Sequence, residues 1–127
     1  MTRLLFVTPD RSNFADLSSE FKKQGGTILW AASGDQALKA IEKQTVDLVV
    51  TDERLGDMTG LELIGRLVTV NPMINCAAVS SLSKEAYHEA SEGLGMLMQL
   101  PPRPSQADGE RLMARLNQIL RLNAPER

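Results

Sequence analysis

Short runs of hydrophobic residues alternate along the chain with stretches in which hydrophobic residues recur every three or four positions. The runs fall at residues 4–7, 27–31, 46–51, 74–79 and 96–100. A short, largely apolar run bounded by turn residues is typical of a strand that is buried on both faces. The pattern therefore predicts five strands in the interior of one sheet.

The stretches between these runs have the spacing of amphipathic helices. Phe14, Leu17 and Phe21 share one helical face, and Gly25 and Gly26 end that helix. Later stripes consist of Ala37, Leu38 and Ile41; of Leu63, Ile64, Leu67 and Val68; and of Leu112, Leu116, Ile119 and Leu120. A more polar helix is predicted over residues 83–92. Each strand is thus followed by a helix.

Five strand–helix units in succession predict an α/β fold with a doubly wound parallel sheet. Strands joined through helices run parallel, and right-handed crossovers place helices on both faces of the sheet. The chain has 127 residues, which suits one domain. No linker or internal repeat interrupts it, so we expect one domain over residues 1–122 and a short tail over residues 123–127.

Composition and charge narrow the classes of function. The chain is 43% hydrophobic and 24% charged, as expected of a globular domain, and its net charge is −2. This balance, without a long basic run, argues against direct nucleic-acid binding. The first apolar run is too short for a signal peptide or a membrane span, so we expect a cytoplasmic protein with no membrane contact. The single cysteine, Cys76, is expected to be a buried apolar residue.

Polar side chains that could carry chemistry are expected where the strands end. In an open parallel sheet, function gathers at the carboxyl ends of the strands, where this chain has Thr8, Asp52, Ser80 and Leu100. Asp52 directly follows an apolar run, so its carboxylate could accept a phosphoryl group or bind a cation. The alternative for Asp52 is a helix cap or turn former. For Ser80 the alternative is a turn residue.

Residues 46–63 resemble the phospho-acceptor segment of the receiver domains of bacterial response regulators. Residues 33–38, residues 78–81 and Pro101 extend the resemblance over nearly the whole chain. The resemblance implies a flavodoxin-like fold with strand order 2-1-3-4-5 and five helices. It also implies a role in two-component signal transduction rather than catalysis.

The resemblance assigns roles to single residues. Asp52 corresponds to the aspartate that takes a phosphoryl group from a histidine kinase, and Ser80 to the hydroxyl residue that contacts that group. Gly60 corresponds to the glycine that opens the third helix. Leu97 stands where receivers usually carry a switch aromatic. Pro101 corresponds to a proline that often follows a cis bond, although trans is the general expectation.

Departures from the family pattern remove most of the charge around Asp52. Thr8 and Pro9 stand where receivers have two acidic residues that help to hold Mg²⁺, and Leu100 stands in place of a lysine. Since Mg²⁺ is usually held through carboxylates, its site at Asp52 is expected to be weak or lost. Arg54 is close enough in sequence to pair with Asp52 in the empty metal space. The alternative is that Arg54 faces solvent.

These residues favour an atypical receiver module that acts by protein–protein contact, with weak or absent phosphorylation. The expected partners are a histidine kinase or another signalling protein and a downstream effector, and a weak homodimer through the last helix is also expected. The residues to inspect for an exposed patch are Leu94, Leu97 and Met113, with core packing as the alternative for the methionine. One alternative is a working receiver phosphorylated on Asp52. Another is a nucleotide or flavin binder, which the glycine-free segment after the first strand disfavours.

Overall fold

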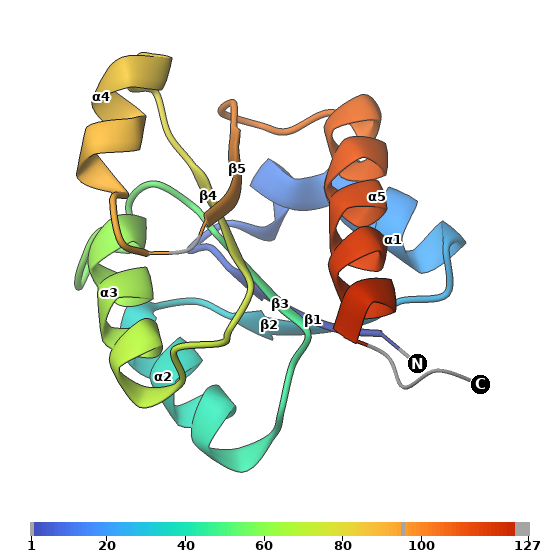
Figure 1. The fold of residues 1–127 in the computed structure, drawn as a ribbon, viewed down its shortest axis with the longest axis horizontal. Coiled ribbons are helices and arrows are strands. Elements are labelled where there is room, and N and C mark those ends of the chain that lie inside the picture. Colours follow the sequence, from blue (N-terminus) through green and yellow to red (C-terminus); the bar gives the residue numbers. More distant parts are fainter. Residues whose placement is uncertain (1, 95, 124–127) are drawn as a thin grey trace.

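The computed structural model describes residues 2–94 and 96–123, which form one parallel sheet covered by helices (Figure 1). The strand order is β2-β1-β3-β4-β5, with every neighbouring pair parallel. The strands are β1 (Arg3–Val7), β2 (Thr27–Ala31), β3 (Leu48–Thr51), β4 (Cys76–Val79) and β5 (Met96–Leu100). The predicted parallel sheet and its order are confirmed.

Helices cover both faces of the sheet. A 3₁₀ turn, η1 (Arg11–Phe14), leads into α1 (Ala15–Lys23), which packs beside α5 (Gln106–Asn123) on one face. The helices α2 (Gly34–Lys43), α3 (Gly60–Val70) and α4 (Lys84–Ala90) lie on the other face. In the part of the chain that the structure describes, no helix combines the length and the low polarity needed to cross a membrane.

Two strands are shorter than predicted at their starts, because side chains and turns replace the strand ladder there. The third was expected from residue 46, but the Asp47 carboxylate accepts a hydrogen bond from the Arg3 backbone N–H at 2.8 Å. The fourth was expected from residue 74, but the Ile74 N–H donates to the Asn71 carbonyl at 3.1 Å within a turn. The pattern of hydrophobic residues alone does not reveal that these groups compete with the sheet for backbone hydrogen bonds.

The strands contribute alternate residues to two separate cores. Phe6 and its neighbours on the same face pack against Phe14, Phe21 and Leu112 from α1 and α5. Residues of opposite parity pack against α2, α3 and α4. Cys76 belongs to this second core and is completely buried, as expected, and burial raises the pKa of its thiol to about 12. The thiol therefore stays protonated and serves as packing.

Candidate functional site

The register of the sheet brings Thr8 and Asp52 side by side. Val7 of β1 is paired with Thr51 of β3, so the next residue of each strand follows at the same edge. The Asp52 N–H donates to the Val7 carbonyl at 2.8 Å, which fixes the start of the β3–α3 loop. Ser80 follows β4, and its N–H donates to the Leu100 carbonyl at 3.0 Å. The structure thus gathers Thr8, Asp52 and Ser80 at the carboxyl edge, as predicted.

Neutral donors surround the Asp52 carboxylate. Its Oδ2 accepts hydrogen bonds from the Thr8 hydroxyl at 2.8 Å and from the Asn13 side-chain amide at 2.9 Å. Its Oδ1 accepts one from the Glu53 N–H at 2.9 Å. The sequence had indicated Thr8 only as a missing ligand, and it had not indicated Asn13, which reaches the carboxylate from the turn η1. Both oxygens therefore accept hydrogen bonds from groups of the chain itself.

Asp10, the acidic residue nearest in sequence to the lost pair, is turned away from Asp52. Its carboxylate caps η1 and accepts from the Ser12 N–H at 3.0 Å and from the Ser12 hydroxyl at 2.7 Å. The Ser12 side chain and then its backbone N–H lower the pKa of Asp10. This carboxylate is thus committed to a local turn.

The side chains around Asp52 do not fit Mg²⁺. Over residues 2–94 and 96–123, no group of three or more His, Cys, Asp or Glu side chains could hold a metal ion. Magnesium takes oxygen ligands in near-octahedral geometry and is usually held through carboxylates. The side chains that contact Asp52 are instead the Asn13 amide and the Thr8 hydroxyl, which also lies 2.9 Å from the Asp10 carbonyl oxygen.

The expected pairing of Arg54 with Asp52 is not formed. The ion pairs among the described residues join Lys39 to Asp35 and Arg111 to Asp108. Arg54 is exposed, and its backbone pairs with Thr59 in an isolated antiparallel bridge. The oxygens of Asp52 already accept hydrogen bonds from Thr8, Asn13 and the Glu53 backbone, and the Arg54 guanidinium is not needed as a further donor.

A second carboxylate links the two loops beside the site. Glu53 Oε2 accepts from the Ser81 N–H at 2.9 Å and from the Ser81 hydroxyl at 3.0 Å, and the Ser80 hydroxyl lies 3.5 Å away. From β5, the Gln99 amide donates to the carbonyls of Ser80 at 3.2 Å and Leu82 at 2.8 Å. Sequence reasoning missed Glu53 and Gln99. The position of Glu53, next to the candidate acceptor, was the one available signal.

The end of β5 offers the site no charge. Leu100 is completely buried and belongs to the core beneath α1 and α5. Leu97 is partly buried against the same core, and its carbonyl accepts from Arg115 at 2.8 Å. Pro101 is exposed, and because the described residues contain no cis peptide bond, the bond before it is trans.

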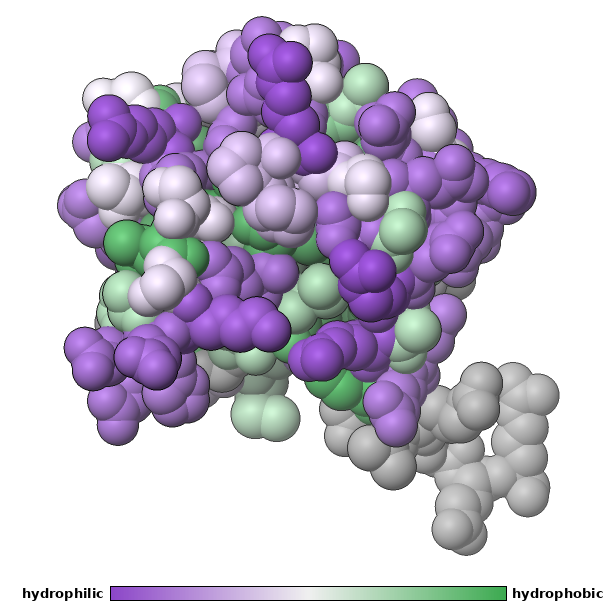
Figure 2. Space-filling model, turned by 90° about the horizontal axis from the view of Figure 1, so that it is seen from above, coloured by the Kyte–Doolittle hydropathy of each residue, from purple (hydrophilic) through white to green (hydrophobic). Residues whose placement is uncertain are grey.

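Leu94, Leu97 and Met113 do not form an exposed patch. Met113 is 3% exposed, and Leu97 packs against the same core beneath α1 and α5. Leu94 is partly buried against the core on the other face of the sheet. Seen from above Figure 1, the surface is largely hydrophilic, with small separate hydrophobic areas (Figure 2).

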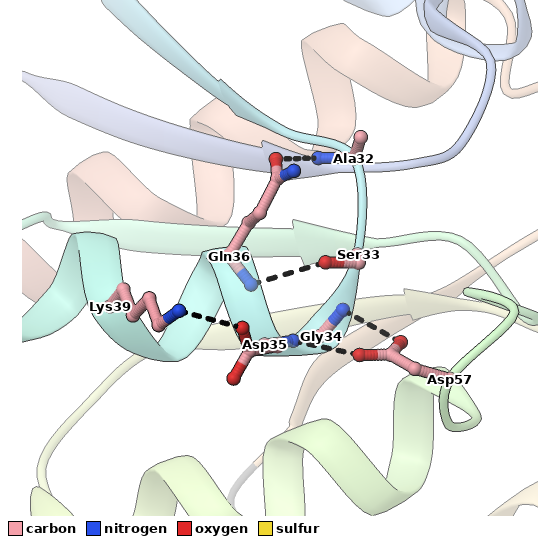
Figure 3. Close-up of polar contacts among 7 residues, drawn as sticks. All are labelled: Ala32, Ser33, Gly34, Asp35, Gln36, Lys39 and Asp57. Atoms are coloured by element: carbon pink, nitrogen blue, oxygen red, sulfur yellow. Dashed lines mark hydrogen bonds and ion pairs between the residues drawn. The ribbon is translucent and has the colours of Figure 1, made fainter.

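The β3–α3 loop is also fastened to the start of α2 (Figure 3). The Asp57 carboxylate accepts from the N–H groups of Gly34 at 3.0 Å and Asp35 at 2.9 Å. These are N–H groups of the first turn of a helix, which have no partner within the helix. The hydrogen bonds from Gly34 and then Asp35 lower the pKa of Asp57. Asp57 thus holds in place the loop that carries Asp52.

We expect Asp57→Asn to lower the free energy of unfolding at neutral pH, because an amide offers one acceptor oxygen where the carboxylate offers two. The folded pKa of Asp57 is lowered from 3.8, so its contribution is complete above that value. It is lost as the pH falls through the folded pKa. Urea unfolding of both chains at a series of pH values should show a difference that disappears in acid.

The matched control is Asp16→Asn in α1. Asp16 is exposed, and its carboxylate makes no hydrogen bond or ion pair with the other described residues. With Asp16→Asn, the free energy of unfolding plotted against pH should run nearly parallel to that of the parent chain. A difference for Asp57→Asn that persisted unchanged into acid would contradict the assigned role.

Comparisons with known proteins agree with this geometry. The family model described as "Response regulator receiver domain" matches residues 4–118. Sporulation initiation phosphotransferase F of Bacillus subtilis is 28% identical over 98 residues, which cover 76% of this chain and 79% of that protein. The transcriptional regulatory protein GlrR of Escherichia coli is 30% identical over 69 residues, 54% of this chain. The matched part is only 16% of GlrR's length.

Solved structures show the same fold. A two-component response regulator from Clostridium difficile superposes with a TM-score of 0.81 at 22% identity, over 98% of this chain and 100% of that one. The chemotaxis response regulator CheY4 of Vibrio cholerae superposes with a TM-score of 0.80 at 18% identity, over 91% and 98%. With the family match over residues 4–118, the chain belongs to the response regulator receiver domains of two-component signalling.

Proposed function

We propose that this receiver signals by protein–protein contact and that Asp52 is phosphorylated weakly or not at all. One observation carries the proposal: hydrogen bonds from Thr8, Asn13 and the Glu53 backbone already engage both oxygens of the Asp52 carboxylate. Oδ2, which accepts two of these bonds, must lose at least one before it can attack a phosphorus atom, and Oδ1 keeps one acceptor site besides its bond to the Glu53 N–H. The carboxylate is therefore a poor nucleophile as it stands.

The chemistry of phosphoryl transfer supports the same conclusion. Catalysis of this reaction depends mostly on positioning and on neutralising the charge of the transferred group. Around Asp52 the neighbouring donors are a hydroxyl and two amides, and Leu100 brings no charge. The proposed module therefore has no catalysis of its own. A cytoplasmic location belongs to the same proposal.

A groove on the α4–β5–α5 side suits a protein partner. It has a volume of about 830 Å³, and its lining includes Tyr87, His88, Met96, Met98, Arg111 and Arg115. Aromatic, methionine and arginine side chains are enriched at protein interfaces, and methionines adapt to different partners. We call this groove, with all the residues that line it, the partner groove. We propose that a kinase, another signalling protein or an effector contacts it.

The proposal is tested by intact mass after incubation with acetyl phosphate and Mg²⁺. We expect little or no phosphoryl adduct on the parent chain, because the side chains around Asp52 supply no charge to neutralise the transferred group and Asp52 Oδ2 already accepts two hydrogen bonds. Asp52→Asn is the matched control, and an ordinary receiver run in parallel shows that the reagent works. Circular dichroism before and after incubation verifies that the sample is folded.

An adduct that forms on the parent chain to the same extent as on the ordinary receiver, and is missing from Asp52→Asn, would overturn the proposal. The chain would then be a working receiver phosphorylated on Asp52. An adduct of equal extent on the parent chain and on Asp52→Asn would be modification elsewhere, which agrees with the proposal.

A further inference from the structure

Glu53 places a carboxylate against the loop that follows β4. Its Oε2 accepts two hydrogen bonds from Ser81, through the backbone N–H and the hydroxyl, and lies 3.5 Å from the Ser80 hydroxyl. The contact joins segments 28 residues apart in sequence. It is the link between the loop that carries Asp52 and the β4–α4 loop.

The donors that meet Glu53 are suited to an anion. Two hydroxyls and one backbone N–H converge on a single oxygen, and hydrogen bonds to a charged acceptor are about twice as strong as those between neutral groups. The family resemblance makes Ser80 the side chain that a phosphoryl group on Asp52 would contact. The Glu53 carboxylate lies 3.5 Å from the Ser80 hydroxyl.

We propose that Glu53 is an internal substitute for the phosphoryl group. Its carboxylate occupies the anion position at Ser80 and Ser81 and keeps the β4–α4 loop in one arrangement without phosphorylation. The inference rests on the proposed function, since a module that signals without phosphorylation needs another charge to hold this loop.

Glu53 is itself held in the geometry that this role requires. Its N–H donates to Asp52 Oδ1 at 2.9 Å, and its carbonyl accepts from the Gly60 N–H at 3.0 Å. The backbone on both sides of the side chain is thus fixed to the candidate acceptor and to the start of α3. Only the side-chain torsions of Glu53 are then left to be ordered when its carboxylate binds Ser81.

The loop that Glu53 holds is also part of the partner groove. Ser80, Ser81 and Leu82 contribute to its lining together with Tyr87 and Met98. A shift of the loop therefore changes the wall of the surface that is proposed to meet a partner. Gln99 supports the same loop from β5, but through a neutral amide. Glu53 supplies the charged contact.

The test is the backbone order parameter of the β4–α4 loop, measured by ¹⁵N relaxation without any phosphodonor. In the parent chain we expect values near 0.85 for Ser81 and Leu82, as in rigid backbone, falling below about 0.6 in Glu53→Gln and Glu53→Ala. Glu42→Gln is the matched control. Glu42 is exposed on α2 and makes no hydrogen bond or ion pair with the other described residues.

Unchanged order parameters at Ser81 and Leu82 in both Glu53 variants, in chains whose other amide signals stay in place, would overturn the inference. Loss of order in the Glu42→Gln control as well would also overturn it, because the effect would then follow from net charge. The mass experiment on Asp52 uses other variants and a phosphodonor. A full phosphoryl adduct on Asp52 would refute the proposed function. A β4–α4 loop that stays rigid in the Glu53 variants would refute the role of Glu53.

Discussion

Replacing Phe6 by alanine is expected to lower the free energy of unfolding by about 3–5 kcal/mol. Phe6 is completely buried in β1 at the centre of an aromatic cluster. Its ring meets those of Phe14, Phe21 and Trp30 edge to face, at centroid distances of 5.4, 5.3 and 5.3 Å. Alanine would leave a cavity and remove three favourable ring contacts.

Urea unfolding followed by circular dichroism measures this effect. Small domains have only about 5–15 kcal/mol of stability, so Phe6→Ala is paired with the milder Phe6→Leu, which should still fold. The leucine variant keeps most of the volume and should lose on the order of 1–2 kcal/mol. A loss below 1 kcal/mol in the alanine variant would contradict the central place of Phe6 in the core.

Gly60→Ala is expected to lower the free energy of unfolding by about 3 kcal/mol, at the upper end of overpacking effects. A Cβ at this position would lie 2.3 Å from the Asp52 carbonyl oxygen and 2.9 Å from Thr51 Cγ2. The Asp52 carbonyl oxygen is a backbone atom of the candidate acceptor itself, so it can move only if the β3–α3 loop moves. We therefore expect the amide signals of Asp52 and Glu53 to shift as well.

Gly65→Ala is the matched control within the same helix. A Cβ on Gly65 meets nothing within 4 Å, and alanine is the better helix former by about 1 kcal/mol. Gly65→Ala should thus raise the unfolding free energy while Gly60→Ala lowers it. A rise in the unfolding free energy of both variants, measured by urea unfolding, would show that helix propensity rather than the close approach to Asp52 decides the result.

The fold could be predicted from the sequence because its strands are apolar on both faces. Parallel strands covered by helices leave continuous hydrophobic runs, and the helices between them have a different period. Strand starts were predicted less well. The Asp47 carboxylate and the turn at Asn71 compete with the sheet for backbone donors, and this competition depends on contacts from elsewhere in the chain.

The site could be predicted only at its strand ends. Asp52 and Ser80 follow apolar runs, so the pattern locates them. Asn13 reaches Asp52 because η1 turns at that point, and no pattern of hydrophobic residues specifies a 3₁₀ turn. For Arg54 the sequence left two alternatives, pairing with Asp52 or facing solvent. The Asp52 carboxylate accepts hydrogen bonds from neutral donors, and Arg54 is exposed.

The hydrogen bond from Thr8 to Asp52 makes it harder to build a metal-binding pocket here by single substitutions. A carboxylate in place of that hydroxyl would remove a donor from Asp52 and add a like charge beside it. Like charges in one site disfavour ionisation of both groups, and without a cation the folded chain is less stable. Acidic ligands restored one at a time therefore weaken the fold before they bind metal. The neutral donors around Asp52 thus favour a pocket in which a single acidic replacement of Thr8 lowers the stability of the fold.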